Sequence, residues 1–171
     1  MPAPDDAVTA VEVVDAAVAA GVTVATAESL TGGALCGALV DVPGASATVL
    51  GGVVAYQAQV KVAVLGVAAE VMRDRGVVSE ETAIAMARGV CDVTGAELGV
   101  STTGAAGPDA HDGAAAGTVC IAVWVDGAAR SRTLVLPGDR AVVRAGAVTA
   151  ALALVAEALD ERIGRSAESQ T

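Results

Sequence analysis

The sequence is poor in aromatic side chains. Among its 171 residues there is no phenylalanine, and Tyr56 and Trp124 are the only tyrosine and tryptophan. The interior must therefore be filled mainly by alanine, valine and leucine, whose small side chains let helices and strands approach closely. We expect a ligand pocket in such a protein to be polar and shallow rather than a roomy apolar cavity.

Histidine and cysteine are also scarce. His111 is the only histidine, and the three cysteines, Cys36, Cys91 and Cys120, are widely spaced. The sequence contains no Cys-x-x-Cys motif and no Cys/His pair, which are the patterns of disulfide frameworks and zinc sites. It therefore predicts three reduced thiols, no metal site and no cofactor. His111 has no partner nearby in the sequence and is interpreted as incidental.

Basic residues are half as numerous as acidic ones. Ten lysines and arginines stand against 20 aspartates and glutamates, which gives a formal net charge of −10. A field of this sign repels polyanions, so we expect neither nucleic acid nor an anionic membrane as a partner. An anionic small molecule could still bind where cations or backbone N–H groups cluster.

Targeting and membrane-spanning patterns are not found either. Residues 1–6 have neither the positive region nor the apolar region of a signal peptide. The most apolar long stretch, residues 141–159, contains Arg144 and Glu157 and is typical of an amphipathic helix. We therefore expect a soluble, cytoplasmic protein with a single domain over residues 1–163 and a polar, disordered tail over residues 164–171.

The order of the predicted elements indicates an α/β fold. Ser79 and Asp139 are expected helix N-caps, and Asp126-Gly127 is typical of a β-hairpin turn. The fold class predicted is a three-layer domain with a mixed β-sheet, helices on both faces, and a C-terminal hairpin followed by a long helix. The predicted helices cover residues 6–20, 34–40, 58–65, 68–75, 80–95 and 139–163, and the predicted strands cover residues 22–25, 48–56, 98–102, 117–125 and 129–136.

Residues 26–33, Thr-Ala-Glu-Ser-Leu-Thr-Gly-Gly, connect a predicted strand to a predicted helix. They place the hydroxyl of Ser29 at the carboxyl end of the sheet, where open α/β sheets bind ligands. The backbone N–H groups of Thr31, Gly32 and Gly33 at the helix start could hold an anion or an oxyanion. The same spacing also fits a plain helix cap, with Ser29 or Thr31 as the capping residue and the glycines serving close packing.

A serine nucleophile needs a base, and Lys61 with Tyr56 is the candidate. Lys61 lies in an otherwise apolar predicted helix, where desolvation can make a lysine neutral near pH 7. His111 lies in a different loop, which argues against a Ser-His-Asp triad. Short-chain dehydrogenases also use Ser, Tyr and Lys, but the Tyr-to-Lys spacing differs here and no dinucleotide-binding glycine motif follows the first strand. The alternative is a surface lysine beside a half-buried tyrosine.

Two further segments could bind a substrate. The glycine-rich loop 103–117 follows a predicted strand, and loops of this length in compact domains are often functional. Arg140 and Arg144 are four residues apart in the first turns of the last helix, where two guanidiniums could clamp a phosphate. An ordinary surface loop and a pair of solvated arginines are the alternatives. The loop residues predicted to contact a phosphate or ribose are Thr103, Gly104, Gly107 and Asp109.

Taken together, these segments resemble the CinA C-terminal domain family, whose stand-alone members are nicotinamide-nucleotide amidases. The resemblance implies hydrolysis of the carboxamide of nicotinamide mononucleotide, which gives nicotinic acid mononucleotide and ammonia. It also implies Ser29 as the nucleophile served by Tyr56 and Lys61, no metal requirement, and assembly as a homodimer or higher homo-oligomer. The matching stretches run in family order along nearly the whole chain: residues 26–33, 56–61, 65–67, 76–79, 103–109, 117–119 and 138–144.

Some positions depart from the usual pattern of that family. Leu30 stands where cysteine is common, and Ala58 where a polar residue is common. Residues 114–116, all alanine, stand where a basic residue followed by Pro-Val is common. Two alternatives therefore stay open: a non-catalytic module that binds a nucleotide or phosphate, and an amidase that acts on another amide.

Overall fold

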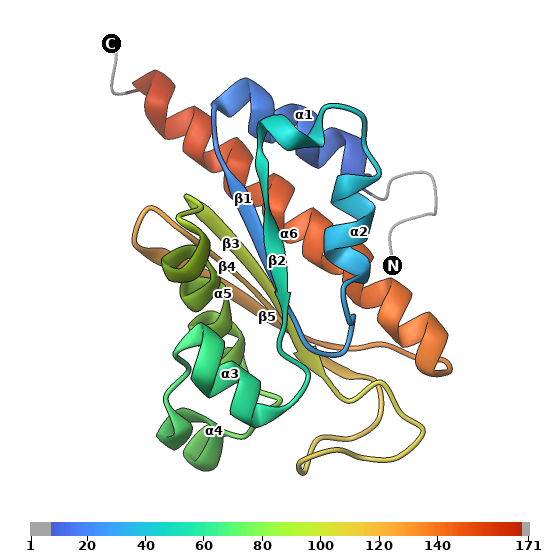
Figure 1. Cartoon of the computed structure of the whole chain (residues 1–171). Helices are drawn as coiled ribbons and strands as arrows, with labels where there is room; N and C mark the ends of the chain where they lie inside the picture. The colour runs from blue at the N-terminus through green and yellow to red at the C-terminus, as the bar shows by residue number, and fades with distance from the viewer. Residues whose placement is uncertain (1–7, 169–171) are drawn as a thin grey trace.

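The computed structural model describes the backbone of residues 8–168, and its centre is a five-stranded mixed sheet. The sheet has the order β2-β1-β3-β4-β5 (Figure 1). β2, β1 and β3 run parallel, and β4 and β5 continue the sheet antiparallel. The strands are β1 (Val24–Glu28), β2 (Val49–Val54), β3 (Leu98–Gly104), β4 (Thr118–Val125) and β5 (Ala128–Val135). The predicted mixed α/β sheet is confirmed.

Helices cover both faces of this sheet (Figure 1). One hydrophobic cluster joins α1, α2 and α6 to one face, and others join α3 and α5 to the opposite face, with α4 packed against α5. The three-layer arrangement thus agrees with the prediction. The helices are α1 (Ala10–Ala20), α2 (Ala34–Val40), α3 (Ala58–Leu65), α4 (Ala69–Arg75), α5 (Glu80–Thr94) and α6 (Arg140–Glu168), and a short 3₁₀ helix covers Ala45–Ala47.

The predicted hairpin and helix caps are present. β4 and β5 are joined by Asp126 and Gly127, both with positive φ, as a tight hairpin turn requires. Ser79 caps α5 by accepting a hydrogen bond from the backbone N of Thr82 at 3.1 Å. Asp139 accepts bonds from the first N–H groups of α6. These features depend on neighbouring residues only, so local sequence signals are sufficient to locate them.

The first helix is shorter than predicted. It begins at Ala10 and not at residue 6, because Thr9 and Glu12 form a capping box: the backbone N of Thr9 donates to the Glu12 carboxylate at 2.7 Å, and the backbone N of Glu12 donates to Thr9 Oγ1 at 3.3 Å. Residues 6 and 7 lie outside the described residues. The predicted end at Gly21 is correct.

The last helix is longer than predicted. It continues to Glu168, so residues 164–168 of the predicted disordered tail are helical, while residues 169–171 lie outside the described part. Beyond Gly164 the sequence contains no proline or glycine that would end a helix. By length and composition alone, residues 140–164 could cross a membrane. In the fold one side of this helix lies in the core, through buried residues such as Val143, Leu154 and Leu159.

The first strand extends further than predicted, and this places the candidate nucleophile. β1 ends at Glu28 and not at Ala25, because it pairs with β2 on one side and β3 on the other up to that residue. Ser29 follows directly. The carboxyl ends of the three parallel strands β1, β2 and β3 therefore lie at one edge of the sheet.

Candidate functional site

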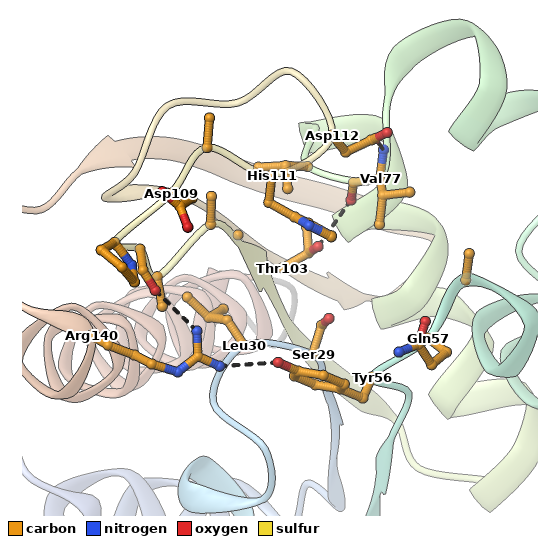
Figure 2. A pocket seen from close by; sticks show the side chains of 18 residues that line it. Ser29, Leu30, Tyr56, Gln57, Val77, Thr103, Asp109, His111, Asp112 and Arg140 are labelled. Carbon is orange, nitrogen blue, oxygen red and sulfur yellow. Dashed lines mark hydrogen bonds between the residues drawn. The ribbon is translucent and has the colours of Figure 1, made fainter.

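A cavity of about 440 Å³ opens at the carboxyl ends of the parallel strands (Figure 2). Its volume is within the roughly 300–1,000 Å³ usual for small-molecule sites. Segments that are distant in the sequence form its walls. It is lined by Ser29 and Leu30 after β1, residues 56–58 after β2, Val77 and Val78 before α5, residues 103–112 after β3, and Arg140 at the start of α6.

Ser29 and Lys61 are in direct contact. Lys61 Nζ lies 3.0 Å from Ser29 Oγ and donates to the carbonyl oxygen of Ala55 at 2.8 Å. The carbonyl oxygen of Tyr56 lies 3.5 Å from the same nitrogen. Lys61 is fully buried, and desolvation lowers its pKa from 10.5 to about 8. The predicted pairing of serine and lysine is therefore present in the fold, and the alternative of a surface lysine is wrong.

The burial of Lys61 is unusual for its helix. On α3 the apolar residues Val62 and Val64 are exposed, whereas Lys61 points inward and is 0% exposed. Lys61 is the only lysine of the sequence, and the salt bridges among the described residues include none to it. An inward lysine without a carboxylate partner destabilises the fold. Its proximity to Ser29 gives a chemical reason for this placement.

Tyr56 lines the cavity, but its hydroxyl group contacts an arginine. Arg140 Nη2 donates to the Tyr56 hydroxyl at 3.0 Å, and Arg140 Nη1 donates to the carbonyl oxygen of Gly107 at 3.3 Å (Figure 2). Tyr56 approaches Lys61 only through its backbone carbonyl. The tyrosine hydroxyl therefore does not connect Ser29 to Lys61, because it is bound to Arg140 on α6.

The glycines after Ser29 do not present their N–H groups to the cavity. Gly33 N donates to Glu28 Oε2 at 2.9 Å, and Gly32 N donates to the carbonyl oxygen of Ser29 at 3.2 Å. Neither glycine is among the residues that line the cavity. The prediction that these N–H groups bind the substrate is therefore wrong, because they are bound within the chain.

Glu28 explains this arrangement. Its side chain is fully buried at the start of α2, where it also accepts hydrogen bonds from Leu35 N at 3.0 Å and Cys36 N at 2.7 Å. An anion is stabilised at a helix N-terminus by the unpaired N–H groups there, and here the chain supplies its own. α2 begins after Gly33 without a side-chain cap, so the alternative in which Ser29 or Thr31 is the helix cap is also wrong.

Thr31, in the turn that follows Ser29, and Arg144, on α6, do not line the cavity. Thr31 is fully buried, with its hydroxyl 2.7 Å from that of Thr102. Arg144 Nε donates to the carbonyl oxygen of Leu30 at 2.9 Å, and its Nη2 donates to that of Thr31 at 2.7 Å. The expected phosphate clamp of two arginines is thus not formed. Of the pair, Arg140 alone lines the cavity.

The loop after β3 forms the opposite wall, as predicted for Thr103, Gly104, Gly107 and Asp109, which all line the cavity. The loop is tied to the segment before α5. Thr103 Oγ1 donates to the carbonyl oxygen of Val77 at 2.9 Å, and Val77 N donates to Asp112 Oδ2 at 2.6 Å (Figure 2). These bonds hold the loop over the cavity.

The sequence interpretation missed His111, Asp112 and Gln57, which also line the cavity. His111 was interpreted as incidental because no partner is near it in the sequence, whereas the fold places it across the cavity from Tyr56 (Figure 2). The only available signal was the pair of aspartates near it, Asp109 and Asp112, in a loop otherwise rich in glycine and alanine. Within the described part of the chain, no cluster of three or more His, Cys, Asp or Glu residues could hold a metal ion.

The sequence of this chain matches known proteins over most of its length. Residues 6–159 match the model of the CinA C-terminal domain. A putative competence-damage inducible protein from Desulforamulus reducens is 47% identical over 133 residues, which cover 78% of this chain and 32% of that protein. A CinA-like protein from Frankia casuarinae is also 47% identical over 133 residues, covering 78% of this chain and 31% of that protein. The chain spans about a third of the length of these curated relatives.

Solved structures of CinA superfamily proteins have a similar fold. A CinA superfamily protein from Klebsiella pneumoniae has a TM-score of 0.86 at 35% identity, covering 89% of this chain and 96% of that one. Another from Escherichia coli has a TM-score of 0.86 at 30% identity, covering 91% and 92%. The chain therefore belongs to the CinA C-terminal domain family.

Proposed function

We propose that this protein is an amidohydrolase that converts nicotinamide mononucleotide to nicotinic acid mononucleotide and ammonia. The observation that carries the proposal is the contact of 3.0 Å between Lys61 Nζ and Ser29 Oγ at the edge of the cavity. A hydroxyl beside a desolvated amine is the arrangement that nucleophilic catalysis without histidine requires. The substrate is the one that the family resemblance implies.

The hydrogen bonds around Lys61 fit a general base. A neutral amine has two N–H donors and one lone pair. In the neutral state, the carbonyl oxygens of Ala55 and Tyr56 would accept the two N–H groups of Lys61, and its lone pair would accept the proton of the Ser29 hydroxyl. Because the pKa of Lys61 is lowered to about 8, roughly a tenth of the molecules carry this neutral amine at pH 7.

The reaction then proceeds in two steps. Lys61 takes the hydroxyl proton of Ser29 while Oγ bonds to the carboxamide carbon, and the resulting tetrahedral intermediate releases ammonia after Lys61 returns the proton to nitrogen. The product of this step is an ester of Ser29. Water attacks the ester carbon, Lys61 accepts its proton, and the proton passes to Ser29 Oγ as the carboxylic acid leaves.

Arg140 is the group proposed to bind the phosphate. It lines the cavity and is held in place by the Tyr56 hydroxyl and the Gly107 carbonyl. Guanidinium groups bind phosphate oxygens through two parallel hydrogen bonds. Thr103 and Asp109, on the loop across the cavity, are proposed contacts for the ribose hydroxyls.

The test is ammonia release from nicotinamide mononucleotide by purified wild-type protein and Ser29→Ala. The variant should lose turnover and keep its fold. Ser101→Ala is a matched control, because Ser101 is a buried serine of the same sheet that donates to the Ala83 carbonyl at 2.6 Å and does not line the cavity. It should keep turnover. Substantial activity in Ser29→Ala would refute the role of Ser29 as the nucleophile.

Two further measurements, binding of the mononucleotide and ammonia release from other amides, separate the proposal from its alternatives. A non-catalytic binding module would bind the mononucleotide, measured by calorimetry, without releasing ammonia. An amidase for another substrate would release ammonia from free nicotinamide or a different amide at least as fast as from the mononucleotide. We also propose that the protein is cytoplasmic, that it binds neither membranes nor nucleic acid, and that it assembles as a homo-oligomer. Sedimentation analysis would test the assembly.

A further inference from the structure

The turn after Ser29 contains two backbone N–H groups that have no acceptor among the residues that the structure describes. Ser29 N donates to the Thr102 carbonyl at 2.9 Å, and Gly32 N returns to the Ser29 carbonyl. The N–H groups of residues 33, 35 and 36 donate to Glu28, and that of residue 34 donates to the Thr31 carbonyl. Among the hydrogen bonds of the described residues, none uses the N–H of Leu30 or Thr31.

These two N–H groups are in buried residues. Leu30 is 4% exposed and Thr31 is fully buried. More than nine in ten buried backbone N–H groups in proteins have a partner, because an unpaired one costs roughly as much as a lost hydrogen bond. Leu30 directly follows a serine that contacts a buried lysine, so its unpaired N–H group points to a ligand. Leu30 also lines the cavity.

We infer that the N–H group of Leu30 binds the oxyanion formed on the substrate, and that Arg144 and Glu28 are positioning residues that hold the turn around it in place. The inference rests on the proposed function, because it assigns a donor for the intermediate that Ser29 forms. The glycine N–H groups are excluded from this role, since Gly32 and Gly33 already donate within the chain.

Arg144 donates hydrogen bonds to the two peptide carbonyl groups that follow the Leu30 N–H group. It binds the carbonyl oxygens of Leu30 and Thr31 with two different nitrogens, at 2.9 Å and 2.7 Å. A carbonyl fixed in one direction fixes the orientation of the peptide plane to which it belongs. The Leu30 carbonyl shares its peptide plane with the Thr31 N–H. Arg144 thus fixes the peptide plane that directly follows the Leu30 N–H group.

Glu28 holds the other end of the same turn. Its carboxylate binds three N–H groups at the start of α2 and is braced by the Thr26 hydroxyl at 3.0 Å. The turn between Glu28 and α2 is therefore fixed on both sides, by a carboxylate on its N–H groups and a guanidinium on its carbonyl groups. Donors that are fixed before the reaction need no reorganisation as charge develops on the substrate.

The experiment compares Arg144→Gln and Arg144→Lys with wild type and with Arg73→Gln. Arg73 is an exposed arginine whose side chain is 66% exposed, so its variant controls for the substitution itself. Loss of one oxyanion donor typically lowers kcat by about 10²- to 10³-fold. We expect Arg144→Gln to lower kcat by about 10²-fold with KM changed less than about threefold. Arg144→Lys, which can hold one carbonyl, should recover part of the loss.

A second readout does not depend on the natural substrate. A neutral alkyl fluorophosphonate forms a bond to a reactive serine with loss of fluoride, and its phosphoryl oxygen occupies the oxyanion position. Intact mass spectrometry gives the labelling rate of Ser29, which should fall in Arg144→Gln and remain at the wild-type value in Arg73→Gln. If wild type labels rapidly but releases no ammonia from the mononucleotide, the proposed function fails while the inference is still tested.

Other outcomes would overturn the inference. A higher KM with an unchanged kcat in Arg144→Gln would mean that Arg144 binds the substrate. An unchanged labelling rate would mean that the turn does not need Arg144. Circular dichroism and thermal unfolding of each variant establish that the protein is folded at the assay temperature. If Arg144→Gln is unfolded there, Arg144→Lys decides, and a wild-type kcat and labelling rate in that variant would overturn the inference.

Discussion

The state of Lys61 can be tested directly, because it is the only lysine of the chain. Burial lowers its pKa from 10.5 to about 8, which corresponds to about 3 kcal/mol of preference for the neutral amine. At pH 7 the neutral fraction is then about 300 times that of an ordinary lysine. If the neutral amine is the base, kcat/KM should rise about tenfold for each pH unit up to about pH 8 and level off above it.

The measurement has two parts. Initial rates of ammonia release from pH 6 to pH 9.5, at constant ionic strength, give the pKa that controls kcat/KM. Protein labelled with ¹³C-lysine gives a single set of side-chain NMR signals, so the titration of Lys61 is observed without assignment. The two values should agree. A lysine signal that titrates above pH 10, or a rate profile that is flat between pH 7 and pH 9, would refute the reasoning.

The same shift predicts how stability depends on pH. Between pH 8 and pH 10.5 the unfolded chain keeps the proton on Lys61 while the folded chain has released it, so the free energy of unfolding should rise with pH in this window. Below pH 8 both states are protonated and the dependence from this group disappears. Relative to Lys61→Met, wild type should gain about 2 kcal/mol between pH 7 and pH 9.5, measured by urea unfolding.

Two further substitutions test the surroundings of the site. Arg140→Gln should raise KM about 10- to 100-fold with little change in kcat, because it removes a charged hydrogen-bond donor from the proposed phosphate position; steady-state kinetics would show this, and an unchanged KM would contradict it. Glu28→Gln should lower the free energy of unfolding by about 2 kcal/mol or more, because an amide cannot accept all the hydrogen bonds that the carboxylate accepts. Urea unfolding followed by the fluorescence of Trp124, with the exposed Glu70→Gln as control, measures the difference.

The sequence was sufficient for features that depend on neighbouring residues. The hairpin turn at Asp126-Gly127, the cap at Ser79 and the helix end at Gly21 all follow from residues within a few positions of each other. The pairing of Ser29 with Lys61 was also predicted: a lysine in an apolar helix made it a candidate, and the family resemblance implied it. The capping box of Thr9 and Glu12 was a local signal as well, and it was overlooked.

The roles of the two arginines could not be predicted in the same way. Arg140 and Arg144 are four residues apart on one helix, which suggested a joint function. In the fold Arg144 reaches carbonyl groups that precede it by 113 and 114 residues, and Arg140 reaches Tyr56, 84 residues away. Spacing along a helix fixes which residues share a face, but the loop that lies against that face is decided by the packing of the whole chain.

Glu28 shows a different limit. Its partners, Gly33, Leu35 and Cys36, are only five to eight residues away, so the interaction is local. The β-branched run that predicts the strand covers residues 22–25, and the site interpretation continued the strand to Glu28 and Ser29 without fixing the direction of the Glu28 side chain. Only the pairing of β1 with two neighbouring strands extends the strand to Glu28 and turns this side chain towards α2. Because the sequence did not show which way the Glu28 side chain points, the helix start was left open to an external anion.

The charges of the site follow from these placements. In a chain with a net charge of −10, the start of α2 would be a position for an anion, but Glu28 occupies it from within. Lys61 is desolvated and loses much of its charge near pH 8, and Arg144 is bound to carbonyl groups of the turn. Arg140 is thus the permanent cation among the described residues that line the cavity. Arg140 is therefore the proposed position of the substrate phosphate, and the carboxamide of the proposed substrate is the part that would lie against Ser29.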